Sequence, residues 1–212
     1  MVINQSKSST AVFNTRAKDF YPRMVNSSGE QYDNVEEFKL LGVEFVSHPK
    51  SGVSWNKYIL KCVRSAQNNM WILKRLAEMG VSIEDLLMTY MSRIRILLEM
   101  NVPLWNFSIS KKMSQIMEKV QKACVFIILG KHATQDYFCN LSILDLEPLS
   151  DRRYTLCKDF ATKTFKHPVH GQMFQRKEGT QTRGTRRVIV PVGKTARYNK
   201  SSVPNLARLL NE

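Results

Sequence analysis

The sequence predicts an α+β fold, with a small β-rich part at the amino-terminal end, a helical bundle in the middle and a basic tail. Three observations indicate this arrangement. β-prone residues and turn residues dominate residues 1–53, apolar side chains recur at helical spacing over residues 54–168, and glycine, proline and basic residues mark residues 169–212. With 212 residues and 43% hydrophobic composition, the chain can bury one ordinary core with an appended tail.

The β-rich part contains two predicted strands. Residues 10–14 and 38–46 are rich in β-branched and aromatic side chains, as strands usually are. Residues 26–29 predict a loop and residues 49–52 predict a break. Gly42 interrupts the second strand, and a glycine inside a strand pattern often marks a β-bulge or a place where another backbone approaches closely.

Two helices are predicted between Ser54 and Pro103. Gly80 can end the first helix, and Ser82 is a suitable N-cap for the second, with Asp85 in the capping-box position. Each helix carries one apolar stripe at spacings of three and four residues. The first stripe consists of Ile59, Val63, Ala66, Met70, Leu73 and Ala77, and the second consists of Leu86, Tyr90, Ile94 and Leu97.

Two further helices are predicted before the tail. One covers residues 110–130, and the other precedes Pro168, with a short apolar piece over residues 141–146 between them. Their apolar positions are Met113, Ile116, Val120, Ala123 and Ile127 in the first, and Leu149, Leu156, Phe160 and Ala161 in the second. Beyond Pro168 the apolar periodicity is weak, so we expect a mobile or extended, partly disordered tail.

The charge of the chain favours a polyanionic partner. The net charge is +14 and the pI is near 9.8. Residues 1–53 hold six basic and six acidic residues, residues 54–168 hold seventeen and ten, and residues 169–212 hold nine and two. An excess of basic residues alone also fits a protein that binds a membrane surface or a soluble protein without a charged partner. The positions of the charges are therefore more informative about the partner than their number.

Two predicted helices carry rows of cations beside their apolar stripes. Spacings of three and four residues place the members of each row on one helix face, where they could follow a phosphate backbone. The alternative is a solvated helix face, which is what most charged rows are. The first row consists of Lys57, Lys61, Arg64, Asn68, Trp71 and Arg75, and the second consists of Lys112, Gln115, Lys119 and Lys122.

The cysteines and histidines predict neither disulfides nor a metal site. Cys62, Cys124, Cys139 and Cys157 show no CxxC spacing. A site built from Cys157, His167 and His170 can be imagined, but Cys157 falls on an apolar helix face, and we expect a buried thiol and two exposed imidazoles instead. No run approaches the eighteen or so apolar residues of a membrane span. We therefore expect a soluble intracellular protein of the cytoplasm or nucleus, with no membrane partner.

Two segments resemble a known polymerase layout. Asn4-Gln5-Ser6-Lys7-Ser8 fits an Asn-x-x-Lys-Thr/Ser pattern, and Phe38-Lys39-Leu40-Leu41-Gly42-Val43 follows about thirty residues later. In this order the segments resemble the last palm elements of reverse transcriptases of jockey-like, non-long-terminal-repeat retrotransposons. Shorter similarities follow in the family's order, at Trp55 with Ile59, Trp71, Tyr90, Trp105, residues 118–123, 127–130, 146–149 and 152–153, and Arg197-Tyr198 with residues 206–211.

The resemblance implies a role for each segment. Residues 1–53 would be the end of the palm, a small β-hairpin remnant in which Leu41, Gly42 and Val43 form a primer grip that holds the 3′ end of the growing strand. Residues 54–168 would be the thumb, which holds the template-primer duplex. Lys7 would be a general acid for the leaving pyrophosphate in a complete palm, whereas in the isolated chain we favour an ordinary surface lysine.

The family's magnesium-binding aspartates precede its lysine segment, so we expect this chain to begin partway through a larger fold. Mg²⁺ would belong to the complete parent enzyme, and we expect no cofactor in this chain. The expected function is therefore that of a carboxy-terminal part of an RNA-directed DNA polymerase, which binds an RNA–DNA or DNA duplex and is inactive alone. Its other expected partner is the amino-terminal half of the polymerase. The alternative is a non-catalytic helical scaffold or interaction protein derived from such an element.

Overall fold

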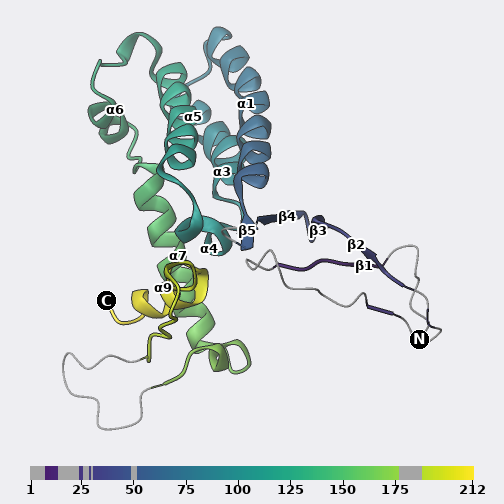
Figure 1. The fold of residues 1–212 in the computed structure, drawn as a ribbon. Helices are drawn as coiled ribbons and strands as arrows, with labels where there is room; N and C mark the ends of the chain where they lie inside the picture. Colours follow the sequence, from purple (N-terminus) through teal and green to yellow (C-terminus); the bar gives the residue numbers. More distant parts are fainter. Residues whose placement is uncertain (1–7, 14–23, 26–28, 30, 49–51, 177–187) are drawn as a thin grey trace. The chain divides into compact units, whose positions relative to one another are not determined.

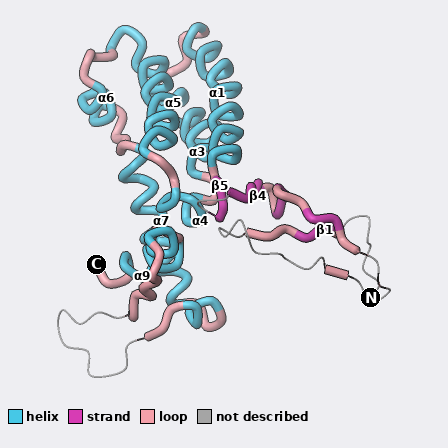
Figure 2. The backbone as a smooth tube through the Cα atoms, in the orientation of Figure 1, coloured by secondary structure: helices cyan, strands magenta, loops and turns pink. Residues whose placement is uncertain are grey.

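The structure is a computed structural model that describes residues 8–13, 24–25, 29, 31–48, 52–176 and 188–212. The chain divides into two compact units, Met1–Tyr58 and Ile59–Glu212. The described strands all lie in the first unit, and helices make up most of the described part of the second, as the magenta and cyan segments of Figure 2 show. The α+β fold class is confirmed.

The first unit contains two small sheets. Strand β1 (Ser9–Thr10) pairs in parallel with β2 (Asp33–Asn34). Strands β3 (Glu37–Leu40), β4 (Val43–His48) and β5 (Gly52–Ser54) form an antiparallel sheet in that order. Four aromatic rings pack in this unit. The ring centre of Phe38 lies 5.7 Å from that of Phe13 and 5.0 Å from that of Phe45. The ring centre of Phe45 lies 5.4 Å from that of Trp55. Such ring contacts add packing energy that a sheet this small needs.

The composition of residues 38–46 predicts one strand, and the polymerase resemblance implies a hairpin. The structure has the hairpin. Phe38 pairs with Phe45 and Leu40 pairs with Val43, so only Leu41 and Gly42 remain for the turn. Both have positive φ, 49° for Leu41 and 85° for Gly42. A two-residue turn of this kind matches the twist of its strands, and glycine adopts it easily. The expected β-bulge at Gly42 is therefore wrong. The other predicted strand, residues 10–14, is a strand only at Thr10, and Asn14 lies outside the described residues.

Helix α1 (Asn56–Glu78) follows the prediction closely. Four members of the predicted stripe are buried, and Met70 and Ala77 are half-buried. The buried members are Ile59, Val63, Ala66 and Leu73. The helix ends at Gly80, whose φ is 78°. The N–H of Val81 donates to the carbonyl of Leu76 at 3.2 Å, which satisfies a carbonyl that the helix leaves unpaired.

The second predicted helix is continuous but changes its winding. It consists of α2 (Ile83–Thr89), a π-helical segment η2 (Tyr90–Arg95) and α3 (Ile96–Glu99). The Ser82 cap is confirmed, because its hydroxyl accepts a hydrogen bond from the N–H of Asp85 at 3.2 Å. A π turn takes up an extra residue. The fourth apolar position therefore moves from the predicted Leu97, which is half-buried, to Leu98, which is buried.

Helix α5 (Lys111–Leu129) begins after the predicted Ser110 cap, but its buried face is shifted by one residue from the prediction. Met113 and Val120 are buried as expected, whereas Ile116, Ala123 and Ile127 are only half-buried. Their neighbours Met117, Cys124 and Ile128 are buried in their place. The helix is apolar on two adjacent faces, so the spacing alone could not decide which face lies deeper.

The remaining elements of the helical part surround α5 and the helix α7 (Leu149–Lys166). They are α4 (Val102–Trp105), η3 (Asn106–Ser108), η4 (Gly130–His132), α6 (Tyr137–Ile143) and η5 (His170–Met173). Helix α5 contacts α2, α6 and α7. In α7, Leu149, Cys157 and Ala161 are buried as expected. The other two predicted positions differ, because Leu156 is half-buried and Phe160 is exposed.

Residues 188–212, where the sequence shows little apolar periodicity, contain two helices. Helices α8 (Ala196–Asn199) and α9 (Ser202–Leu209) lie here, and α9 packs against α7 and α4 (Figure 1). Leu206, Ala207 and Leu209 are buried. Helix α9 is short but strongly amphipathic, and a stripe of this length is easily overlooked beside the glycines and prolines that precede it.

We expect Leu206→Ala to lower the free energy of unfolding by about 2 to 5 kcal/mol, because it leaves a cavity under α9. Val192→Ala is the matched control, since Val192 is 79% exposed. Urea unfolding followed by circular dichroism measures both. Equal midpoints for the two variants would show that α9 does not dock on the helical unit.

Candidate nucleic-acid interface

The cationic row of α1 lies on the face opposite the buried stripe. Each of its members precedes a member of the apolar stripe by two residues, which is about 200° around a helix. All six are exposed: Lys57, Lys61, Arg64, Asn68, Trp71 and Arg75. Trp71 is 65% exposed, which is unusual for so large an apolar side chain. The helix therefore has one buried apolar face and one exposed cationic face, and the cationic face carries a single aromatic ring, that of Trp71.

Two cations of this row already have acidic partners. Lys57 Nζ lies 2.6 Å from Glu37 Oε2, and this hydrogen bond raises the pKa of Lys57 above its usual value. Arg75 Nη1 lies 3.1 Å from Glu78 Oε2. Both pairs are solvent-exposed and are worth little to stability. They reduce the net charge at the two ends of the row.

The second predicted row lies on the surface of α5. Lys112, Gln115, Lys119 and Lys122 are all exposed. Lys122 Nζ lies 5.7 Å from the centre of the Tyr137 ring, within the range of a cation–π contact. Lys111, which the prediction left out, begins the same helix and is also exposed.

The predicted grip residues occupy the β3–β4 turn. Leu41 is 95% exposed at the tip, and it holds a left-handed conformation that is uncommon for leucine. Gly42 lies beside it in the turn, whereas Val43 is buried. Only Leu41 and Gly42 can therefore touch a partner. The predicted general acid, Lys7, lies outside the described residues.

A buried polar network joins α5 to its neighbours, and the sequence analysis did not find it. Gln121 is fully buried. Its Oε1 accepts from the Tyr90 hydroxyl at 2.6 Å, and its Nε2 donates to the Tyr137 hydroxyl at 3.0 Å and to the Glu147 carbonyl at 2.9 Å. Burial raises the pKa of Tyr90 far above the usual value for a phenol. A glutamine between helical lysines looks like a surface residue, so no local signal marked it.

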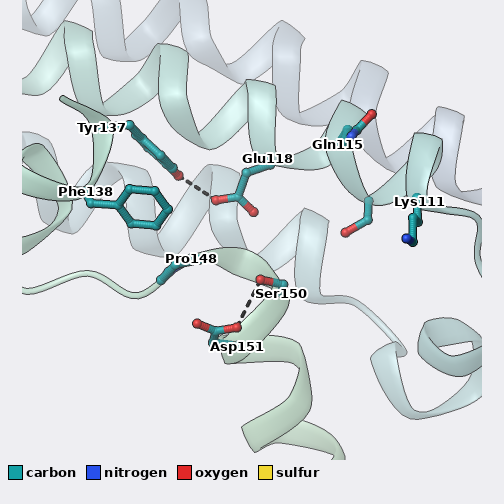
Figure 3. Close-up of a pocket in the computed structure, with 9 residues that line it drawn as sticks. Lys111, Gln115, Glu118, Tyr137, Phe138, Pro148, Ser150 and Asp151 are labelled. Carbon is teal, nitrogen blue, oxygen red and sulfur yellow. Dashed lines mark hydrogen bonds between the residues drawn. The ribbon is translucent and has the colours of Figure 1, made fainter. Parts of the chain in front are cut away.

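Glu118 extends this network to the start of α7. Its Oε1 accepts from the Tyr137 hydroxyl at 2.6 Å (Figure 3). Its Oε2 accepts from the N–H of Leu149 at 3.1 Å. Burial, followed by the hydrogen bond to Glu118, raises the pKa of Tyr137 above the range of an ordinary tyrosine. A carboxylate at a helix N-terminus is favourable because of the helix dipole. Glu118 thus caps α7 from another helix.

Two arginines near the start of α7 have structural roles. Arg152 Nε lies 3.2 Å from Glu99 Oε1. Arg153 is 3% exposed, and it donates from Nε to Asn106 Oδ1 at 3.0 Å and from Nη2 to Ser114 Oγ at 2.6 Å. Burial lowers the pKa of Arg153. These cations hold α7 against its neighbours, so we exclude them from the candidate interface.

A hollow of about 510 Å³ opens beside the α5 row. Figure 3 shows the side chains of Glu118 and Phe138 turned toward one another in it, with Pro148 and Asp151 on the α7 side. The full lining consists of Lys111, Ser114, Gln115, Glu118, Tyr137, Phe138, Pro148, Ser150 and Asp151. Gln115 belongs both to the hollow and to the cationic row, so the two features adjoin.

The imagined metal site at Cys157 is not formed. Cys157 is buried, and burial raises the pKa of its thiol to about 11, while His167 and His170 are exposed and stack 4.4 Å apart. Among the described residues, no three histidine, cysteine or acidic side chains gather as metal ligands. Within the same residues, all four cysteines are free thiols and no helix has the length and apolar character to cross a membrane.

Comparisons of this chain with protein-family models, with curated proteins and with solved structures found no match.

We expect Gln121→Met to lower the free energy of unfolding by about 1 to 3 kcal/mol, because it leaves the Tyr90 hydroxyl buried without its acceptor. Gln115→Met is the matched control on the same helix, since Gln115 is exposed. Urea unfolding measures the two. If both variants had the same urea midpoint as the unmodified protein, the network would not contribute to stability.

Proposed function

We propose that this chain is the carboxy-terminal part of a reverse transcriptase of a non-long-terminal-repeat retrotransposon, and that it grips the template-primer duplex. The proposal starts from the order of the polymerase-like segments in the sequence, from Lys7 through the Leu41-Gly42-Val43 turn to the helices. It assigns the helical part to the thumb and the β3–β4 hairpin to the primer grip. The chain would bind nucleic acid and depend on the rest of the palm for catalysis.

The observation that carries this proposal is the two-sided character of α1. Its cationic side chains are exposed from Lys57 to Arg75 of a 23-residue helix, while the opposite face is mostly buried. The distance from Lys61 to Arg75 is about 21 Å along the helix axis, at 1.5 Å per residue. Double-stranded DNA presents a phosphate about every 3.4 Å along each strand, so a face of this length spans several phosphates.

Two further features support the same function. The α5 row adds Lys112, Lys119 and Lys122 on the helical unit. The β3–β4 turn presents an exposed apolar tip at Leu41, held in a left-handed conformation, and such outliers cluster at functional sites. An exposed tip of this kind fits a contact with the sugar and base of a primer end.

A second candidate function is a non-catalytic scaffold derived from such an element. The ion pairs Lys57–Glu37 and Arg75–Glu78 favour it, because cations that are already paired have less to gain from phosphate. In that case the α1 face would be solvated and inert. The two functions differ in one measurable property, the salt dependence of binding to a duplex.

We expect the double variant Lys61→Gln/Arg64→Gln to weaken binding to an RNA–DNA primer-template at low salt. Each lost phosphate contact should reduce the slope of log K against log salt by a little under one unit, so the slope should shrink by about two. Fluorescence anisotropy over a series of salt concentrations measures both quantities. The fold should be unaffected, because the buried stripe lies on the opposite face of α1.

The control for this experiment is Lys158→Gln/Lys163→Gln, which removes the same charge from exposed positions on α7. It should lower affinity only through the net charge of the chain. If the two double variants gave the same affinity and slope, the α1 face would be an ordinary solvated face, and the scaffold function would be favoured.

We expect the purified chain to add no nucleotides to a primed RNA template with Mg²⁺ or Mn²⁺. Two-metal phosphoryl transfer needs carboxylates that hold both ions, and the seven aspartates of this sequence are dispersed with no adjacent pair. A primer-extension assay with a known reverse transcriptase as positive control tests this. Incorporation that co-purifies with the chain and is lost in a Lys7→Ala variant would contradict it.

A further inference from the structure

We propose that the hollow between α5, α6 and α7 binds one unpaired nucleobase, with guanine preferred, while the α5 cations hold the phosphates on either side of it. The inference rests on the proposed function, since it assumes that the chain binds nucleic acid. It adds a site outside the duplex-binding face of α1, together with the class of its ligand. The hollow measures about 510 Å³, within the usual range of small-ligand pockets.

The wall of the hollow offers a stacking surface. Phe138 is 65% exposed, although it is a large apolar ring, and its centre lies 5.8 Å from that of Tyr137. Pro148 adds an apolar surface to the lining. Proteins that bind single strands hold bases against such exposed rings, at about 1 to 3 kcal/mol per base. The exposure of Phe138 is costly in water and would be relieved by a stacked base.

The charges of the hollow favour a base over a phosphate. Two carboxylates, Glu118 and Asp151, line it with one cation, Lys111, and carboxylates accept hydrogen bonds but repel phosphate. Glu118 is already engaged by Tyr137 and by the start of α7. Asp151 is exposed and accepts from the Ser150 hydroxyl at 3.1 Å, so its carboxylate keeps lone pairs for a ligand. Guanine presents two adjacent N–H donors on its Watson–Crick edge, and one carboxylate can accept from both. Uracil presents only one such donor.

Cations flank the acidic interior on the adjoining side of α5. Gln115 lines the hollow and also belongs to the row formed with Lys112, Lys119 and Lys122. Lys112 and Lys122 are ten residues apart, which is about 15 Å along the helix. A strand of a few nucleotides could therefore lie along this row with one base turned into the hollow. The arrangement of a cationic track beside an aromatic platform is typical of single-strand binding.

The test compares nonamers of uridine that carry a guanosine, an inosine or a uridine at the central position. Inosine lacks the 2-amino group and so keeps only one of the two donors. Fluorescence anisotropy at low salt should show the guanosine oligomer binding about tenfold more tightly than the uridine oligomer, as expected for two parallel hydrogen bonds to one carboxylate. The inosine oligomer should fall between them.

Variants then locate the effect. Asp151→Asn should bring guanosine binding down to the level of inosine and leave uridine binding unchanged. Phe138→Leu should weaken guanosine binding about fivefold or more, because leucine keeps apolar volume but cannot stack as a ring does. Phe160→Leu is the matched control: Phe160 is exposed on α7 but lies about 13 Å along that helix from Asp151. It should change nothing.

Each result decides one of the two proposals. Equal affinity for the three oligomers, with salt-dependent duplex binding retained, would overturn the base-binding hollow alone. The same holds if Asp151→Asn kept the full preference for guanosine. If neither the oligomers nor an RNA–DNA duplex bound at low salt, the proposed function would fail together with the hollow.

Discussion

The buried carboxamide of Gln121 is the interaction on which the helical unit depends most. It connects α5 to the Tyr90 hydroxyl in the π-helical segment, to the Tyr137 hydroxyl in α6 and to the Glu147 carbonyl just before α7. Glu118, one turn earlier, caps α7. Buried polar groups of this kind are costly unless every partner is present, so they favour a single arrangement of the helices around α5. Once that side of α5 faces inward, its lysines must face the solvent.

The same separation of faces accounts for α1. The buried stripe and the cationic row are offset by two residues along one helix, so neither disturbs the other. A helix that is dry on one side and cationic on the other can bind a polyanion without any change in its packing. The ion pairs at Lys57 and Arg75 reduce the net charge at the two ends of this face. The polymerase-like order of segments in the sequence gives this surface its proposed ligand.

The sequence predicts the class of the fold and the exposed rows well, and it fails where the decisive contacts are not local. The stripe of α1 and the Ser82 and Ser110 caps follow from spacing and capping chemistry, which depend on near neighbours. The exchange of Leu97 for Leu98 follows from a π turn, which the spacing does not indicate. Helix α9 and Gln121 acquire their roles only from partners far along the chain. The hollow beside α5 likewise requires three elements to meet.

Lysine footprinting tests the central claim most directly, because it reports each cation separately. The protein would be acetylated with and without an RNA–DNA primer-template, and mass spectrometry would give the protection of every lysine. The account predicts that Lys61, Lys112 and Lys119 become protected in the complex, whereas Lys158 and Lys163 react at the same rate as in the free protein. Uniform protection of all five lysines, or protection confined to the α7 pair, would contradict the assignment of α1 and α5 as the faces that hold the primer-template.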